Sequence, residues 1–327
     1  MPTPLEELVT TAAGGAERPL VWLPFDPADL GAGLPDGVEV AEVEPGRMPD
    51  AEGFDRVRFF VPDYEGGFDM AKTLARMTSL QVVQTQTAGV DNVAPHLPDG
   101  VTLCNARGVH DASTAELAVG LLLATLRGCP DVVRAQDEGR WAYGHRRSLA
   151  DSTVIIVGAG SIATALRNRL LPFEVEVLRV GTRSREDDAG VVHGRDELPD
   201  LLPTADAVVL LVPLTDGTHH LVDASFLSRM RDGAVLVNVA RGPIVDTDAL
   251  LAETTSRRLL AAVDVTDPEP LPPDHPLWHS PGVLISPHVG GATSAMLPRV
   301  HELLREQLTR FAAGAPLANV VVDAHAV

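Results

Sequence analysis

Cysteine, basic side chains and long apolar runs are all scarce in this sequence. The chain has 327 residues and 2 cysteines, which cannot build a disulfide framework and do not stand at a zinc spacing such as C-x-x-C, so we expect a reducing compartment. Lys and Arg number 26 against 45 Asp and Glu, and the formal net charge of −19 disfavours nucleic-acid or anionic-membrane binding through a broad basic surface. The longest apolar runs, such as Leu117 to Leu126, are far shorter than the ~18 residues that span a bilayer.

The N-terminal stretch MPTPLEELV lacks a basic segment followed by an apolar run. We therefore expect no secretory signal and a cytoplasmic protein. The length suggests about two domains, each large enough to bury its own core. His219 and His220 are adjacent, but no further ligands stand at a suitable spacing, so we expect no metal site.

Short apolar runs alternate with Pro-, Gly- and Asp-rich breaks, first before residue 105 and again after Thr153. The first part predicts strands at Leu20–Leu23, Val38–Val43, Val57–Val61 and Gln81–Gln86, with a helix at Met70–Met77. The second part predicts strands at Val154–Val157, Val175–Val180, Ala207–Val212, Ala234–Val239, Leu260–Val265 and Val283–Ile285, and helices at Ile162–Leu171, Asp196–Leu202, Ala224–Met230, Thr247–Glu253 and Leu297–Phe311. Alternating strands and crossover helices predict an α/β protein with doubly wound parallel sheets.

A long apolar helix is expected between the two parts. Ser113 and Glu116 have the S-x-x-E form of a capping box, which predicts that the helix begins near Ser113. Pro130 is expected to break or kink it.

A strand, a glycine turn and a helix start follow one another at Val154–Ala163. Gly158, Gly160 and Ala163 match the G-x-G-x-x-G/A pattern, in which the glycines allow a tight turn and close approach of a pyrophosphate. The helix start at Ser161 and Ile162 offers free N–H groups to the phosphates. This arrangement predicts a dinucleotide-binding site.

The region after the next strand lacks the acid that usually binds the ribose 2′-hydroxyl. It contains instead Thr182, Arg183, Ser184 and Arg185, whose charges and hydroxyls suit a 2′-phosphate. We therefore favour NADP over NAD, and the alternative is a solvated basic loop.

Three later segments carry chemistry at predicted strand ends: VNVARGPIVD around Arg241, DVTDPEP around Glu269 and ISPHVGG around His288. With VIIVGAGSIA, ADAVVLLVPLTDGTHHLV and AAVDVTDPEPLPPDHPLW, these stretches cover residues 150–295 almost continuously. Here the sequence resembles the D-isomer-specific 2-hydroxyacid dehydrogenase family; TAGVDN at 87–92 and NARGVHDASTAE at 105–116 are weaker matches.

The resemblance implies a catalytic trio of Arg241, Glu269 and His288. A guanidinium suits a substrate carboxylate and a keto oxygen. An imidazole suits protonation of the forming alkoxide, and a neighbouring carboxylate favours its charged form. Taken singly, each residue has a structural alternative: a turn arginine, a solvated loop acid or a buried histidine.

The resemblance also implies that backbone N–H groups of Ala88, Gly89 and Val90 bind the substrate carboxylate. It places the remaining cofactor contacts at Val212, Pro213, Thr218, Val239, Ala240 and Asp264, with Asp264 facing the nicotinamide amide.

The family fold implies two Rossmann-like domains with the active site between them: a dinucleotide-binding domain at 106–290 and a substrate domain at 1–105 plus 291–327, joined at hinges near 105 and 291. It further implies a homodimer formed through the cofactor domain; the apolar helix after Ser113 suits either that interface or the intramolecular core. The expected activity is hydride transfer between NAD(P)H and a small 2-keto acid resembling glyoxylate or hydroxypyruvate. Alternatives are a phosphite-type dehydrogenase and a dinucleotide-sensing, corepressor-like binding protein; an acid at Glu269 argues against a formate enzyme.

Overall fold

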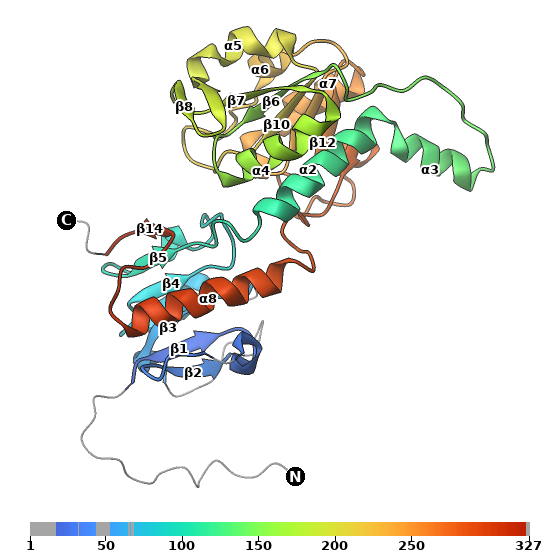
Figure 1. Ribbon diagram of the computed structural model, residues 1–327. Helices are drawn as coiled ribbons and strands as arrows, with labels where there is room; N and C mark the ends of the chain where they lie inside the picture. The colour runs from blue at the N-terminus through green and yellow to red at the C-terminus, as the bar shows by residue number, and fades with distance from the viewer. Residues whose placement is uncertain (1–17, 32, 44–52, 65, 67–68, 325–327) are drawn as a thin grey trace, which may run out of the picture. The chain divides into compact units, whose positions relative to one another are not determined.

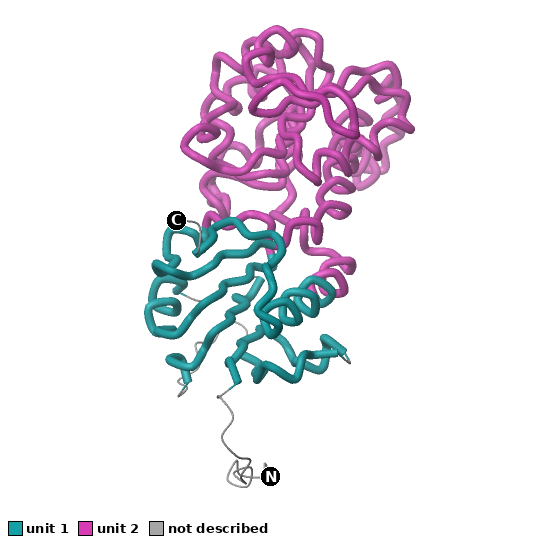
Figure 2. Tube along the Cα trace, turned by 60° about the vertical axis from the view of Figure 1, so that its left-hand side comes forward, with its two compact units in different colours: residues 1–86, 92–105, 301–327 teal, residues 87–91, 106–300 magenta. Residues whose placement is uncertain are grey.

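The computed structural model describes residues 18–31, 33–43, 53–64, 66 and 69–324. The N-terminal stretch MPTPLEELV lies outside these residues. The chain divides into two compact units, one comprising residues 1–86, 92–105 and 301–327 and the other residues 87–91 and 106–300 (Figure 2).

The first unit is built on a sheet of short strands in the order β14-β5-β4-β3-β1-β2. Neighbouring strands are parallel except for β14, which pairs antiparallel with β5. The strands are β1 (Leu20–Leu23), β2 (Glu39–Glu42), β3 (Val57–Phe60), β4 (Val82–Gln84), β5 (Thr102–Cys104) and β14 (Val320–Val322), and the helices are α1 (Met70–Arg76) and most of α8 (Met296–Ala312).

Helix α8 packs against this sheet through one polar and one aromatic contact. The buried Gln307 amide donates to Gln84 Oε1 on β4 at 2.6 Å, and the rings of Phe311 and Phe59 lie 5.2 Å apart. The C-terminal part of the chain thereby completes a unit that the N-terminal part begins.

The second unit contains the larger sheet, in the order β13-β12-β11-β10-β6-β7-β9-β8 (Figure 1). Strand pairs are parallel except β8 with β9. Its strands are β6 (Thr153–Val157), β7 (Glu176–Val180), β8 (Arg185–Asp187), β9 (Gly190–His193), β10 (Ala207–Leu210), β11 (Val235–Asn238), β12 (Leu260–Val263) and β13 (Val283–Ile285); its helices are α2 (Asp111–Leu126), α3 (Cys129–Asp137), α4 (Ser161–Leu170), α5 (Leu198–Leu201), α6 (Ala224–Arg229) and α7 (Thr247–Thr255).

Both faces of the larger sheet are covered, which explains why its strands are apolar throughout. Ile155 on β6 packs into one cluster with Phe226 of α6 and Leu250 of α7. Its neighbour Ile156 points to the other face and packs with residues of α2 and α4 such as Leu122. The α/β class with parallel sheets, predicted from the alternation of elements, is confirmed. Helix α2 contributes to this intramolecular core.

The predicted capping box at Ser113 is wrong. Helix α2 begins at Asp111, so Ser113 lies inside it, and its hydroxyl donates to the carbonyl of His110 at 3.3 Å. The helix ends before Pro130, because Gly128 adopts a φ of 63° between α2 and α3. Pro130 stands in the first turn of α3, where its missing N–H is tolerated.

The predicted helix Asp196–Leu202 is divided into a 3₁₀ turn, the short α5 and a second 3₁₀ turn. Pro199 and Pro203 occupy the first turns of the last two segments, and each removes a backbone donor. The hairpin β8–β9 was not predicted. It is held by buried Arg179 of β7, whose guanidinium donates to both carboxylate oxygens of Asp187, at 3.0 and 2.6 Å.

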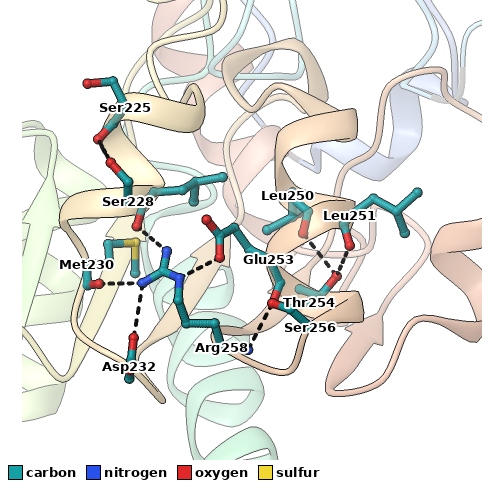
Figure 3. Close-up of polar contacts among 11 residues, drawn as sticks. Ser225, Ser228, Met230, Asp232, Leu250, Leu251, Glu253, Thr254, Ser256 and Arg258 are labelled. Carbon is teal, nitrogen blue, oxygen red and sulfur yellow. Dashed lines mark hydrogen bonds and ion pairs between the residues drawn. The ribbon is translucent and has the colours of Figure 1, made fainter.

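Arg258, just before β12, forms hydrogen bonds with α7 and with the end of α6 (Figure 3). Its guanidinium donates to Glu253 of α7 at 2.5 Å and to the carbonyls of Leu227 and Met230 at the end of α6, at 2.6 and 2.7 Å. The Glu253 carboxylate, and less strongly Asp232, raises the pKa of Arg258. Arg258 therefore joins α6 and α7 through hydrogen bonds from the turn before β12.

The chain passes between the two units near residues 86, 91, 105 and 300. Residues 87–91 group with the larger unit, where Ala106 N–H donates to the Thr87 carbonyl at 2.9 Å. Residues 291–300 also belong to the larger unit, and within them Arg299 donates to the Val109 carbonyl at 3.3 Å.

Candidate active site

The glycine turn lies between β6 and α4, beside the end of β10. Gly158 has a φ of 132°, and a Cβ built there would lie 2.6 Å from the Leu211 carbonyl oxygen. Only glycine fits this position, because both the backbone angle and the contact exclude a side chain. The strand order reverses at β6, which is where doubly wound sheets bind their ligands.

The start of α4 has the properties of a phosphate site. Gly160 is its N-cap, no side chain caps the first N–H groups, and a Cβ built at Gly160 meets no described atom within 4 Å. Unpaired N–H groups at a helix N-terminus favour an anion. Ser161 donates its hydroxyl to Asp111 at 3.0 Å, which joins the starts of α4 and α2. The residues present therefore fit the pyrophosphate of a dinucleotide.

The loop after β7 carries the residues expected at the ribose. Thr182, Arg183 and Ser184 are exposed, and the Ser184 hydroxyl donates to Glu197 at 2.5 Å. This hydrogen bond, those from His193 and the Gly194 N–H, and the His193 charge lower the pKa of Glu197 to about 2. One carboxylate thus stands beside the otherwise basic loop.

The loop after β10 is shaped by Thr218. Its hydroxyl donates to the Pro213 carbonyl at 2.6 Å and accepts from the Thr215 N–H at 2.8 Å. Val212 and Thr218 are half-buried, and Pro213 is exposed. The backbone of this segment is therefore fixed by its own side chains.

Arg241 follows β11 in a turn held by Asn238. The Asn238 amide donates to the Arg241 carbonyl at 2.9 Å, and its oxygen accepts from the Ala240 N–H at 3.1 Å. Val239 and Ala240 are buried. A Cβ at the following Gly242 would overlap the Thr266 carbonyl, so the turn lies directly against the segment that leads to Glu269.

The guanidinium of Arg241 lies on the loop 87–91. Its Nε donates to both carboxylate oxygens of Asp91, at 3.1 and 3.2 Å, and its Nη1 donates to the Ala240 carbonyl at 2.8 Å. Ala88, Gly89 and Val90 are half-buried, and the Thr87 hydroxyl donates to the Gly89 carbonyl at 2.7 Å.

Glu269 and His288 form a pair at the carboxyl end of β13. His288 Nδ1 and Glu269 Oε1 are 2.5 Å apart, which leaves Nε2 as the ring nitrogen that points to other partners. His288 has a φ of 53°, a conformation that a side chain adopts only when its surroundings impose it. Both side chains remain partly exposed, 45% for His288 and 39% for Glu269.

Asp264 builds the turn that carries His288. Its side chain is buried and accepts from the Ser286 hydroxyl at 2.5 Å, the Val289 N–H at 3.0 Å and the Gly290 N–H at 2.8 Å. Its carbonyl accepts from the His288 N–H at 2.7 Å. These contacts account for the unusual backbone angle of His288.

Two residues of this site were not singled out from the sequence. Asn238 and Asp91 act on Arg241 from β11 and from the loop 87–91. Asn238 stands three residues before Arg241 and directly ends a buried strand, which is the signal that could have pointed to it. Asp91 is 150 residues away in the chain, and only the fold brings it to Arg241.

Within the described ranges, no group of three or more His, Cys, Asp and Glu side chains is arranged to hold a metal ion. None of the helices in the described part of the chain is long and apolar enough to cross a bilayer.

A parallel sheet with this switch point, this glycine turn and this imidazole–carboxylate pair defines a dinucleotide-dependent oxidoreductase. The family model for the NAD binding domain of D-isomer specific 2-hydroxyacid dehydrogenases matches residues 119–290. The glyoxylate reductase of Thermofilum pendens is 33% identical over 251 residues, which cover 73% of this chain and 74% of that protein.

Solved structures of 2-hydroxyacid dehydrogenases have a similar fold. A D-isomer specific 2-hydroxyacid dehydrogenase from Xanthobacter autotrophicus Py2, in complex with NADPH and MES, has a TM-score of 0.78 at 29% identity and covers 94% of this chain and 98% of its own. An NADPH-dependent glyoxylate/hydroxypyruvate reductase from Sinorhizobium meliloti, in complex with NADP and malonate, has a TM-score of 0.76 at 26% identity and covers 94% and 97%. The chain belongs to the D-isomer-specific 2-hydroxyacid dehydrogenase family. It is an oxidoreductase that uses a nicotinamide cofactor, as the sequence predicted.

Proposed function

We propose that this protein reduces a small 2-keto acid, of the glyoxylate or hydroxypyruvate type, to a D-2-hydroxy acid. The observation that carries the proposal is the Glu269–His288 pair at 2.5 Å, held next to the turn that presents Arg241. Relatives and structural neighbours named as glyoxylate or hydroxypyruvate reductases support the substrate class.

In this proposal His288 is the acid. Glu269 accepts a hydrogen bond from the Nδ1–H group, so the imidazolium gives its Nε2 proton to the oxygen of the forming alkoxide and is left as the neutral imidazole. The reduced nicotinamide, when bound, supplies the hydride. In the reverse direction His288 acts as the base and Glu269 stabilises the resulting cation.

Arg241 binds the substrate carboxylate and polarises the keto oxygen, because a guanidinium places several donors in one plane. The backbone N–H groups of Ala88, Gly89 and Val90 take the other side of that carboxylate. This assignment is supported by the guanidinium of Arg241, which lies against the backbone of Gly89 in the loop 87–91.

We assign the dinucleotide to the glycine turn and the strand ends around it. Gly158, Gly160, Ser161 and Ile162 hold the pyrophosphate; Val212, Pro213, Thr218, Val239 and Ala240 line the remainder; and Asp264 meets the nicotinamide amide through the acceptor capacity that its hydrogen bonds leave. On this assignment residues 106–290 form the dinucleotide-binding domain, and residues 1–105 with 291–327 form the substrate domain.

NADP is the favoured cofactor in this proposal. Thr182, Arg183 and Ser184 stand where a ribose acid is usual, and the exposed Arg183 provides a cation for a 2′-phosphate. Glu197, which accepts the Ser184 hydroxyl, acts in the opposite sense. Arg183 therefore carries the preference.

A homodimer is the proposed assembly. After α2 the chain forms an arm, residues 128–147, which consists of α3 and an extended segment (Figure 1). Trp141 and Tyr143 on this arm are 93% and 83% exposed, which is unusual for large aromatic side chains. A second copy of the chain would cover them. The free Cys104 and Cys129 suit the proposed cytoplasmic location.

The test is a panel of 2-keto acids offered with NADPH and with NADH, in which the absorbance loss of the reduced nicotinamide is followed. We expect turnover with at least one short 2-keto acid and a higher kcat/KM with NADPH. Cofactor binding without turnover of any 2-keto acid would instead support a binding protein. Phosphite added with the oxidised cofactor tests the remaining alternative, and reduction of that cofactor would support it.

A further inference from the structure

Arg241 is restrained by a loop 150 residues earlier in the chain and by the residue directly before it. Asp91 accepts from Nε with both carboxylate oxygens, at 3.1 and 3.2 Å, and the side chains are 26% exposed for Arg241 and 41% for Asp91. The Ala240 carbonyl accepts from Nη1 at 2.8 Å. Among the described residues, no hydrogen bond from Nη2 is found.

The backbone of Gly89 forms the surface on which this guanidinium lies. A Cβ built at Gly89 would overlap Arg241 Nη2 and Cζ, and it would lie 3.0 Å from Asp91 Oδ1. The Thr87 hydroxyl fixes the Gly89 carbonyl at 2.7 Å. The loop 87–91 therefore provides a flat contact at Gly89 and an acceptor at Asp91, and these two features fix both the plane and the edge of the guanidinium.

We propose that Asp91 is a positioning residue for Arg241. It holds the Nε edge and thereby directs Nη2, for which the described residues offer no acceptor, to the substrate carboxylate. An arginine side chain has many rotamers and loses their entropy when it binds an anion, so a fixed acceptor on Nε lowers that cost before the substrate arrives. This inference rests on the proposed 2-keto acid reduction and adds a residue to it.

The opposite role has a distinguishable consequence. A carboxylate beside a guanidinium can also compete with a substrate carboxylate for the same donors. In that case removal of Asp91 would lower the KM for the keto acid. If Asp91 positions Arg241, its removal raises that KM.

The experiment compares Asp91→Asn and Asp91→Ala with the wild type, using the 2-keto acid that the panel identifies. Asn keeps one oxygen that can accept from Nε, whereas Ala keeps none. We expect the keto-acid KM to rise in the order wild type, Asn, Ala, by about tenfold or more for Ala, with the KM for the reduced nicotinamide unchanged. Asp99→Asn, at an exposed acid of the same chain, is the matched control and should leave both constants unchanged.

A double-mutant cycle ties the effect to Arg241. Lysine at 241 keeps a cation but has no Nε–H edge for Asp91 to hold. Asp91→Asn introduced into an Arg241→Lys background should therefore change the keto-acid KM much less than it does in the wild type. Full additivity of the two substitutions would overturn the proposal.

The remaining outcomes are also decisive. A KM for the keto acid that is unchanged or lowered in both Asp91 variants overturns the positioning role, and so does a loss of nicotinamide binding in parallel with keto-acid binding, because that pattern reports a general structural defect. Failure of the wild type to turn over any 2-keto acid would reject the proposed function itself, before any variant is compared.

Discussion

His288 is held by more interactions than a solvated histidine needs. Its ring is fixed by Glu269, its N–H by the Asp264 carbonyl, and the next two N–H groups by the Asp264 carboxylate. Together these contacts maintain a left-handed backbone angle that is uncommon for residues other than glycine. Such over-determined positions are typical of residues that must present one atom in one direction, and here that atom is Nε2.

Replacement of either member of this pair tests its proposed role. His288→Ala removes the proton donor, and we expect kcat to fall by about 10² to 10⁴. Glu269→Gln keeps the size of the side chain and an oxygen that can accept from Nδ1 but removes the negative charge, so we expect a smaller loss. Steady-state kinetics with the best keto acid measures both variants.

The control is His279→Ala, which replaces an exposed histidine outside the proposed catalytic trio and should retain wild-type rates. Dinucleotide binding, followed by fluorescence, should be preserved in all three variants. A His288→Ala enzyme that turns over like the wild type would show that another group protonates the substrate.

Individual site residues could be predicted from the sequence where the residues around them form a recognisable motif. Glu269 and His288 stand in DPEP and SPH segments, and the structure brings them into contact. Asp91 was not predicted to act on Arg241, because nothing near either residue reports a contact across 150 positions. The three hydrogen bonds that occupy Asp264 were equally invisible, since they depend on the backbone of the following turn.

The hairpin β8–β9 is an element that the sequence did not predict. Its strands are short, and β8 consists of charged, exposed residues. No hydrophobic alternation marks such a strand, because its pairing depends on buried Arg179 and on the Asp187 carboxylate rather than on an apolar face. Arg258 is a similar case: it lies between a predicted helix and a predicted strand, and its guanidinium donates to Glu253 of α7 and to the Leu227 carbonyl of α6 (Figure 3).

The 3₁₀ turn that follows this hairpin contains Glu197, an acid with a testable titration. The Ser184 hydroxyl is the first cause of the low pKa of Glu197, about 2. A depressed carboxyl pKa stabilises the folded state above the unfolded value, and this stabilisation is lost as the pH falls through the folded value. Ser184→Ala should therefore raise the pKa of Glu197 towards its usual value of 4.5 and move the loss of hairpin stability to higher pH.

An NMR titration of the Glu197 carboxyl carbon measures this shift directly. Ser228→Ala removes a hydroxyl that bonds only to the Ser225 carbonyl and serves as the control. If the pKa of Glu197 stays near 2 in Ser184→Ala, then His193 and the Gly194 N–H hold the carboxylate by themselves.

At the scale of the whole molecule, the order of elements was predictable and the division of the chain was less so. Apolar strands with glycine-rich breaks predicted parallel sheets, since burial on both faces leaves a continuous apolar signal. The assignment of residues 87–91 and 291–300 to the larger unit had no such signal. These segments make contacts with residues far away in the chain, such as the hydrogen bond from Arg299 to the Val109 carbonyl.

The proposed homodimer belongs to this scale as well. Helix α2 packs into the core of its own unit, and the exposed apolar surface lies instead on the arm at residues 128–147. Two large aromatic side chains that are more than four-fifths exposed are costly in an isolated chain and are common centres of protein interfaces. Trp141→Ser combined with Tyr143→Ser should therefore raise the dimer Kd by about tenfold or more.

Sedimentation velocity over a range of concentrations measures this change. Val191→Ser, which removes an exposed apolar side chain from the hairpin rather than from the arm, should leave the dimer intact. An unchanged Kd in the double variant would place the interface on another surface of the chain, and a wild type that sediments as a monomer at every concentration would reject the dimer. Because Trp141 and Tyr143 do not belong to the glycine turn between β6 and α4, we expect the double variant to keep its dinucleotide binding even where it loses its partner.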